Sequence, residues 1–82
     1  MIWFIIAALI NTTQGTVDFK INNQIIFNTE SECVEYLSTY DRYIRAGLER
    51  NFPDFKVSDV RCIDNVTAQQ MQNTMRKHRE NN

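Results

Sequence analysis

Residues 29–51 read TESECVEYLSTYDRYIRAGLERN, the most regular stretch of the chain. Thr29 and Glu32 have the Thr-x-x-Glu spacing of a capping box, which satisfies free backbone N–H groups at the start of a helix. Pro53 follows, and the residue before a proline avoids helical backbone angles. Apolar residues at helical spacing define one face: Cys33, Leu37, Tyr40, Ile44 and Leu48. The stretch therefore predicts a helix over about 30–51.

Strands are predicted on both sides of this helix. Residues 17–21 alternate between apolar and polar side chains, as in a half-buried strand, and residues 24–27 resume an apolar run. Asn22-Asn23 lies between them, and Asn tolerates the backbone angles of tight turns. The three segments predict a β-hairpin. Residues 56–63 are rich in β-branched side chains and predict a third strand.

The two cysteines connect these elements. Cys33 lies in the first turn of the predicted helix and Cys62 near the end of the last strand. A disulfide between them closes a loop of roughly 30 residues, for which chain entropy gives about 3.6 kcal/mol of stabilisation. Two unrelated thiols are the alternative, whereas a zinc site needs about four ligands. The predicted fold is α+β: a small antiparallel sheet, a hairpin plus a third strand, packed on one long helix in the order β-β-α-β.

The C-terminal part of the chain is polar. Thr67 and Gln70 again have capping-box spacing, but only a narrow apolar stripe follows, formed by Ala68, Met71, Met75 and His78. A helix with so little apolar area has little to bury. We expect a domain over residues 16–66 and a weak helix or flexible tail over 67–82, ordered to about Met75.

Residues 2–10 are apolar without a break, and the polar residues 11–15 end the run. A helix needs about 20 apolar residues to cross a bilayer, so this run is too short to span one and suits the apolar region of a signal peptide. The small residues Thr13 and Gly15 predict cleavage after Gly15. Two alternatives stay open: a buried strand or core helix of the domain, and an anchor that is never removed.

The length and net charge of the chain exclude several classes of protein. The chain has 82 residues, nine Lys plus Arg and ten Asp plus Glu, for a net charge of −1. This composition excludes a multidomain enzyme and a polytopic membrane protein, and it argues against nucleic-acid binding. The basic cluster of residues 76–79 is interpreted as favourable charge near a helix C-terminus.

No residue pattern predicts catalysis. His78 is the one histidine and lies in the polar tail, and the serines have no histidine partner in the predicted fold. Gly15 and Gly47 are the two glycines, too few for a phosphate-binding loop. The sequence predicts no catalytic residue, no metal site and no cofactor.

Tyr36 and Tyr43 lie on one shoulder of the predicted apolar helix face, and Arg50 lies beside it. Tyrosine and arginine are enriched at the energetic centres of protein interfaces, so these three residues are candidate protein contacts. The alternative is that the tyrosines pack under the hairpin or the second helix with their hydroxyls reaching water.

The layout resembles the loose class of small exported single-disulfide proteins of bacteria and phages. The resemblance is carried by the apolar start at residues 1–15, the Phe-x-Thr-x-x-x-Cys pattern of Phe27 to Cys33, and the closing strand Val57 to Cys62. It implies a secreted or envelope-associated location and no activity.

Together these features predict a small secreted or periplasmic, non-enzymatic protein-binding module, such as an inhibitor or accessory protein acting on an unknown envelope partner. The alternative is a membrane-tethered protein that keeps residues 1–15 and modulates a membrane complex. Contact with a membrane is expected only in that case.

Overall fold

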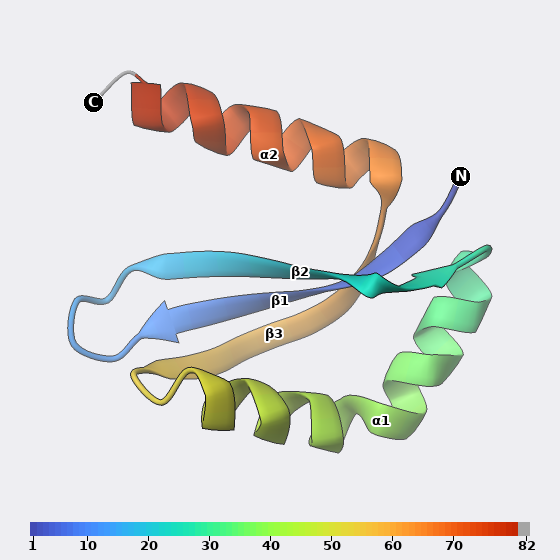
Figure 1. Ribbon diagram of the computed structural model, residues 1–82, viewed down its shortest axis with the longest axis horizontal. Coiled ribbons are helices and arrows are strands. Elements are labelled where there is room, and N and C mark those ends of the chain that lie inside the picture. Colours follow the sequence, from blue (N-terminus) through green and yellow to red (C-terminus); the bar gives the residue numbers. More distant parts are fainter. Residues whose placement is uncertain (81–82) are drawn as a thin grey trace.

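A computed structural model describes the backbone of residues 1–80 and the side chains of residues 1–74 (Figure 1). Three antiparallel strands form one sheet in the order β2-β1-β3. The predicted α+β class, the long helix and the disulfide are confirmed. The elements are β1 (Trp3–Asn11), β2 (Val17–Phe27), α1 (Glu30–Asn51), β3 (Phe55–Asp64) and α2 (Asn65–Glu80).

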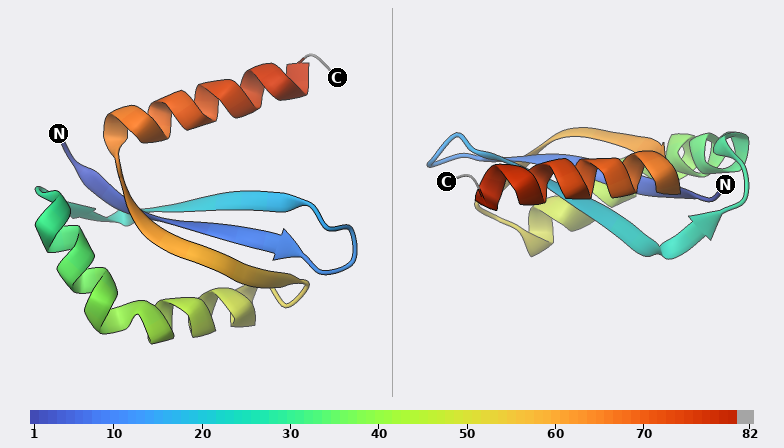
Figure 2. Two further views of the ribbon diagram at one scale, coloured as in Figure 1. Left: turned by 180° about the vertical axis from the view of Figure 1, so that it is seen from behind. Right: turned by 90° about the horizontal axis from the view of Figure 1, so that it is seen from above.

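The chain is arranged in three layers. Figures 1 and 2 show the twisted sheet between the two helices, with α1 on one side and α2 on the other. The larger apolar cluster lies between the sheet and α1 and includes Leu9, Cys33 and Val60. A smaller cluster under the start of α2 contains Ile6, Ile63 and Ala68.

β1 is the central strand, and both of its faces are covered. Ile5, Ala7 and Leu9 belong to the α1 cluster, Ile6 belongs to the α2 cluster, and each is at most 5% exposed. A strand buried on both faces reads as a continuous apolar run instead of an alternating one. In the structure residues 3–11 are the middle of the sheet, so the described fold begins before residue 16, where the sequence predicts the domain to start.

The burial of β1 disagrees with the predicted leader and with its alternative, a retained anchor. The apolar side chains that a leader or an anchor needs are already used in the protein core. Cleavage after Gly15 would remove the strand that joins β2 to β3. Among the described residues, no helix is long and apolar enough to cross a membrane.

The segment expected to be a cleavage site is the turn of the β1–β2 hairpin. The side chain of Asn11 accepts hydrogen bonds from the N–H groups of Thr13 and Gln14, both at 2.9 Å. The N–H of Gly15 donates to the carbonyl of Asn11 at 2.8 Å, and Gly15 has φ +72°. That backbone angle favours glycine, so the small residue serves the turn.

The predicted hairpin within residues 17–27 is not formed. Asn22 and Asn23 lie inside β2, where the side chain of Asn22 accepts from the N–H of Gln24 at 3.0 Å. Ile5 pairs with Asn22 and Trp3 pairs with Phe27, so β2 contains extra residues at this point and bulges. The asparagines bend the strand where the sequence analysis expected them to reverse it.

α1 begins as the sequence predicts. The N–H of Glu32 donates to the hydroxyl oxygen of the N-cap residue Thr29 at 3.1 Å. The helix is bent in its middle (Figure 1). Thr39 is near the middle of α1 in sequence, and its hydroxyl donates to the carbonyl of Glu35 at 3.0 Å. Such contacts to the preceding turn bend helices. The bend lets α1 follow the twisted sheet.

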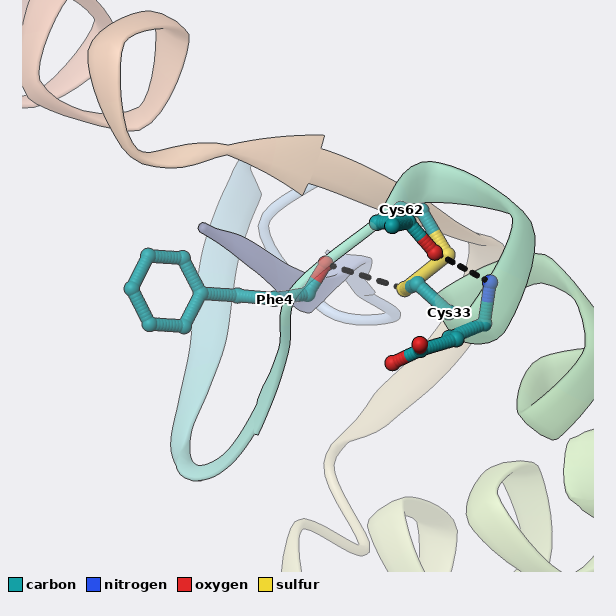
Figure 3. The surroundings of a disulfide bond; sticks show 5 residues. Phe4, Cys33 and Cys62 are labelled. Atoms are coloured by element: carbon teal, nitrogen blue, oxygen red, sulfur yellow. Dashed lines mark hydrogen bonds between the residues drawn. A yellow bond between two sulfur atoms is a disulfide. The ribbon is translucent and has the colours of Figure 1, made fainter. Parts of the chain in front are cut away.

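The predicted disulfide joins Cys33 of α1 to Cys62 of β3, with their Cα atoms 6.2 Å apart. Cys33 is completely buried. Its Sγ lies 3.6 Å from the carbonyl oxygen of Phe4, a close contact and not a hydrogen bond, since an oxidised sulfur carries no proton. Figure 3 shows the Phe4 ring pointing away from the sulfurs. The disulfide therefore lies beside the central strand.

α2 begins one turn earlier than the sequence predicts. Asp64 caps it by accepting from the N–H of Thr67 at 2.7 Å and from the Thr67 hydroxyl at 2.9 Å. The hydrogen bond from the Thr67 N–H is the main reason why the pKa of the Asp64 carboxyl lies below its ordinary value of 3.8. The N–H of Asn65 donates to the carbonyl of Ile2 at 2.9 Å, which ties α2 to the start of the chain.

The backbone of α2 continues to Glu80, past Met75, where we expected order to end. The side chains of His78 and of the basic cluster 76–79 lie outside the described residues, as do the last two residues.

Removing residues 1–15 is expected to leave residues 16–82 without a folded sheet, because β2 and β3 then have no strand between them. The measurement is the dispersion of the amide NMR spectrum of the oxidised fragment. Adding a synthetic peptide of residues 1–15 should restore the dispersed spectrum by supplying β1. A dispersed spectrum of the fragment alone would show that β1 is dispensable.

Breaking the disulfide is expected to lower the free energy of unfolding by about 3–4 kcal/mol, since the unfolded chain regains the entropy of an open loop. Urea unfolding with and without reductant measures the change. The double variant Cys33→Ala/Cys62→Ala serves as the control and should be insensitive to reductant. Equal midpoints for the oxidised and reduced wild-type chain would contradict the prediction.

Candidate functional site

α1 covers the sheet unevenly and leaves a groove beside β2. The helix packs mainly on β3, to which its first turn is bonded through Cys33. The β2 side of the same sheet face is left open and forms a groove of about 550 Å³. We call this feature the α1–β2 groove. Its lining residues are Ile5, Ala7, Lys20, Ile21, Asn22, Gln24, Ile25, Tyr36, Tyr43, Ile44, Gly47, Leu48, Asn51 and Phe52.

The floor and walls of the groove differ in character. Ile5 and Ala7 of the central strand are buried and contribute its apolar floor. Ile44 and Leu48 add partly buried aliphatic side chains from α1. A concave, mostly apolar surface with a few polar groups at its edge is the usual form of a binding site.

Aromatic side chains form one end of the groove. The Tyr36 ring packs between Phe27 and Tyr40, with centroid distances of 5.2 Å and 4.6 Å. Such stacking holds the Tyr36 ring in one orientation. Tyr43 is 74% exposed at the rim. The groove thus presents one fixed and one free tyrosine.

Gly47 widens the groove in the middle of its helical wall. A Cβ built at this position has no atom within 4 Å, so packing inside the chain does not require a glycine. A glycine in a helix interior costs about 0.5–1 kcal/mol relative to alanine. Packing within the chain does not explain why the helix has a destabilising glycine here. The missing side chain leaves an open position between Tyr43 and Leu48.

Lys20 is the charged residue of the groove. Its Nζ lies 5.4 Å from the centroid of the Phe52 ring, a favourable cation–π arrangement that holds the ammonium group over the far end of the groove. No acidic side chain is found among the lining residues. The groove is therefore apolar and weakly positive.

The structure brings together two of the three candidate contact residues. Tyr36 and Tyr43 line the groove, as the shared helix shoulder suggested, whereas the exposed Arg50 is not among the lining residues. Tyr36 also packs in the core, which agrees with the alternative of a packed tyrosine. Tyr40, predicted on the buried face, is 44% exposed.

The strand side of the groove is not evident from the sequence. The sequence predicts a leader for Ile5 and Ala7 and an alternating strand for Lys20, with no groove between them. Which residues of β2 face α1 depends on how β2 pairs with β1. The strand side of the groove can therefore be recognised only once residues 2–10 are placed in the sheet.

Within the part of the chain that is described, no three His, Cys, Asp or Glu side chains cluster as metal ligands would. No family model, curated protein or solved structure matches this chain. The chemistry of the groove is therefore interpreted from its own residues.

Gly47→Ala is expected to raise the free energy of unfolding by about 0.5–1 kcal/mol, because alanine is the better helix former and its methyl group meets no neighbour. Urea unfolding provides the measurement. The matched control is Ala46→Gly at the adjacent exposed helix position, which should lower stability by a similar amount. A destabilised Gly47→Ala chain would show that packing needs the glycine.

Proposed function

We propose that this protein is a small, non-enzymatic protein-binding module and that the α1–β2 groove is its binding surface. The observation that carries the proposal is the exposed Tyr43 ring beside Gly47, at the rim of a groove with an apolar floor. An exposed tyrosine gives large contact area at low entropic cost, and tyrosines are common among residues that dominate binding energy.

The groove favours a partner of particular chemistry. With an apolar floor, aromatic rings at one end and a single cation among its lining residues, it suits a segment rich in aliphatic or aromatic side chains. The open position at Gly47 gives one such side chain room to enter between Tyr43 and Leu48. A strongly charged segment would lose solvation there without finding partner charges.

We also propose that the module works in an oxidising compartment, such as the periplasm or the extracellular space. The Cys33–Cys62 disulfide supports this location, because disulfides persist where thiols are not kept reduced. With residues 3–11 built into the sheet, the proposal of export rests on the disulfide. An inhibitor or accessory role towards an envelope partner fits a module of this size.

A displayed peptide library tests the groove directly. Selection on the oxidised wild-type protein should enrich peptides with aromatic and aliphatic residues. A bound peptide should shift the amide NMR signals of Lys20, Tyr36 and Gly47. Gly47→Leu, which fills the open position, and Tyr43→Ser, which removes the rim aromatic, should each weaken binding by roughly tenfold or more, as expected for central interface residues.

The matched control is Val66→Ser at the start of α2, since Val66 is 49% exposed and is not part of the groove. This variant should bind the selected peptides like the wild type. Failure to enrich any peptide, or equal binding by Gly47→Leu and the wild type, would overturn the assignment of the groove.

A further inference from the structure

β2 is an edge strand with exposed apolar side chains. It pairs with β1 on one side only. Val17 is 50% exposed and Phe19 is 41% exposed, and both lie on the sheet face opposite α1. An edge that offers free backbone groups next to exposed apolar side chains is a template for another strand.

We infer that residues 17–21 of β2 pair with the same residues of a second copy of this chain, antiparallel, with Phe19 on the two-fold axis. The six strands then form one continuous sheet. A two-fold contact uses the same surface on both copies, so this surface must be complementary to itself. The inference concerns the outer edge of β2 and does not depend on the proposed function of the groove.

The sequence VDFKI of residues 17–21 meets this requirement. Side chains that lie directly opposite each other in an antiparallel pair share a face. With Phe19 opposite Phe19 of the second copy, Val17 lies opposite Ile21 on the α2 side. On the α1 side, Asp18 lies opposite Lys20. Every apolar residue meets an apolar one, and each charge meets its opposite.

The charges also disfavour pairing in which one strand is shifted along the other. A shift by two residues places Asp18 opposite Asp18 or Lys20 opposite Lys20, and like charges in opposite positions destabilise a sheet. An odd shift sets apolar residues against charged ones. Within the described part of the chain, neither Asp18 nor Lys20 forms an ion pair. Neither charge is committed to an ion pair, and the Lys20 ammonium would exchange its position over the Phe52 ring for the Asp18 carboxylate of the second copy.

The structure leaves room beside this edge. α2 passes above β2 in Figure 1, and a shallow hollow of about 310 Å³, open to solvent, lies between Phe19 and α2. Its lining comprises Phe19, Thr67, Gln70, Met71 and Thr74. The apolar side chains of an added strand would project into this space, against Met71. The side chains of the second copy's strand thus fill part of the space between the extended sheet and α2.

The other edge strand does not offer such a surface. Val57 and Val60 of β3 are each 7% exposed because α1 covers them. On the opposite face, Asp59 and Arg61 already bond to each other at 2.7 Å. Pairing is therefore expected at β2.

Charge reversal combined with mixing tests the pairing. Analytical ultracentrifugation of the wild type over a concentration series should show a monomer–dimer equilibrium. Asp18→Lys and Lys20→Asp each place like charges opposite one another twice, and each should raise the dimer dissociation constant by at least about tenfold. An equimolar mixture of the two variants should dimerise like the wild type, because each lysine of one variant then lies opposite an aspartate of the other. The double variant Asp18→Lys/Lys20→Asp should also dimerise.

A second measurement uses the wild-type chain alone. Carbodiimide treatment of a mixture of labelled and unlabelled protein should yield Asp18–Lys20 amides that join one labelled chain to one unlabelled chain. A wild type that stays monomeric, single variants that dimerise as well as the wild type, or a mixture that does not recover dimerisation would each overturn the inference. Far-UV circular dichroism shows that each variant is folded.

Discussion

The fold depends on a central strand that is buried on both faces. β1 pairs with β2 and β3 along nearly its whole length, and its alternate side chains enter the two apolar clusters on opposite sides of the sheet. β2 and β3 have no direct pairing with each other. The hairpin, the disulfide and both helices are therefore arranged around residues 3–11.

The disulfide then determines where α1 lies. It fixes the first turn of the helix to β3 beside the central strand, and the bend in the middle of the helix carries the rest of α1 along the same side. A helix held over β3 cannot also cover β2. The α1–β2 groove is thus a geometric consequence of the bond that stabilises the fold, with Gly47 keeping it open.

Local signals in the sequence were sufficient for part of this structure. Helix α1 was predictable because Thr29, Glu32 and the apolar spacing act within a few turns, and the cysteine pairing followed from there being two cysteines. The role of residues 2–10 was not predictable, because a short unbroken apolar run fits a leader, an anchor or a doubly buried strand equally well. Length and composition cannot separate these, and only the pairing partners do.

Two further elements differ from the sequence-based prediction, and the first difference follows from the position of the apolar run in the sheet. Without β1, residues 17–27 must supply their own hairpin, and Asn22-Asn23 is the natural turn. With β1 present, the turn is at Asn11–Gly15 and the asparagines form a bulge. The cap of α2 was misplaced for a different reason. Asp64 belongs to β3 and to the helix start at once, and a strand residue is not expected to cap.

Including β1 in the domain also changes what the exposed apolar residues mean. A domain starting at residue 16 appears to lack core residues, and exposed side chains would then be a symptom of a poor core. With Ile5, Ile6, Ala7 and Leu9 inside, the core is filled from both sides, yet Val17, Phe19 and Tyr43 stay exposed. All three lie on or next to β2, the strand that neither helix covers fully. Exposed apolar side chains also lie elsewhere, such as Val34 of α1 and Val66 of α2. Those of β2 differ in flanking an unpaired strand edge, and this combination favours association.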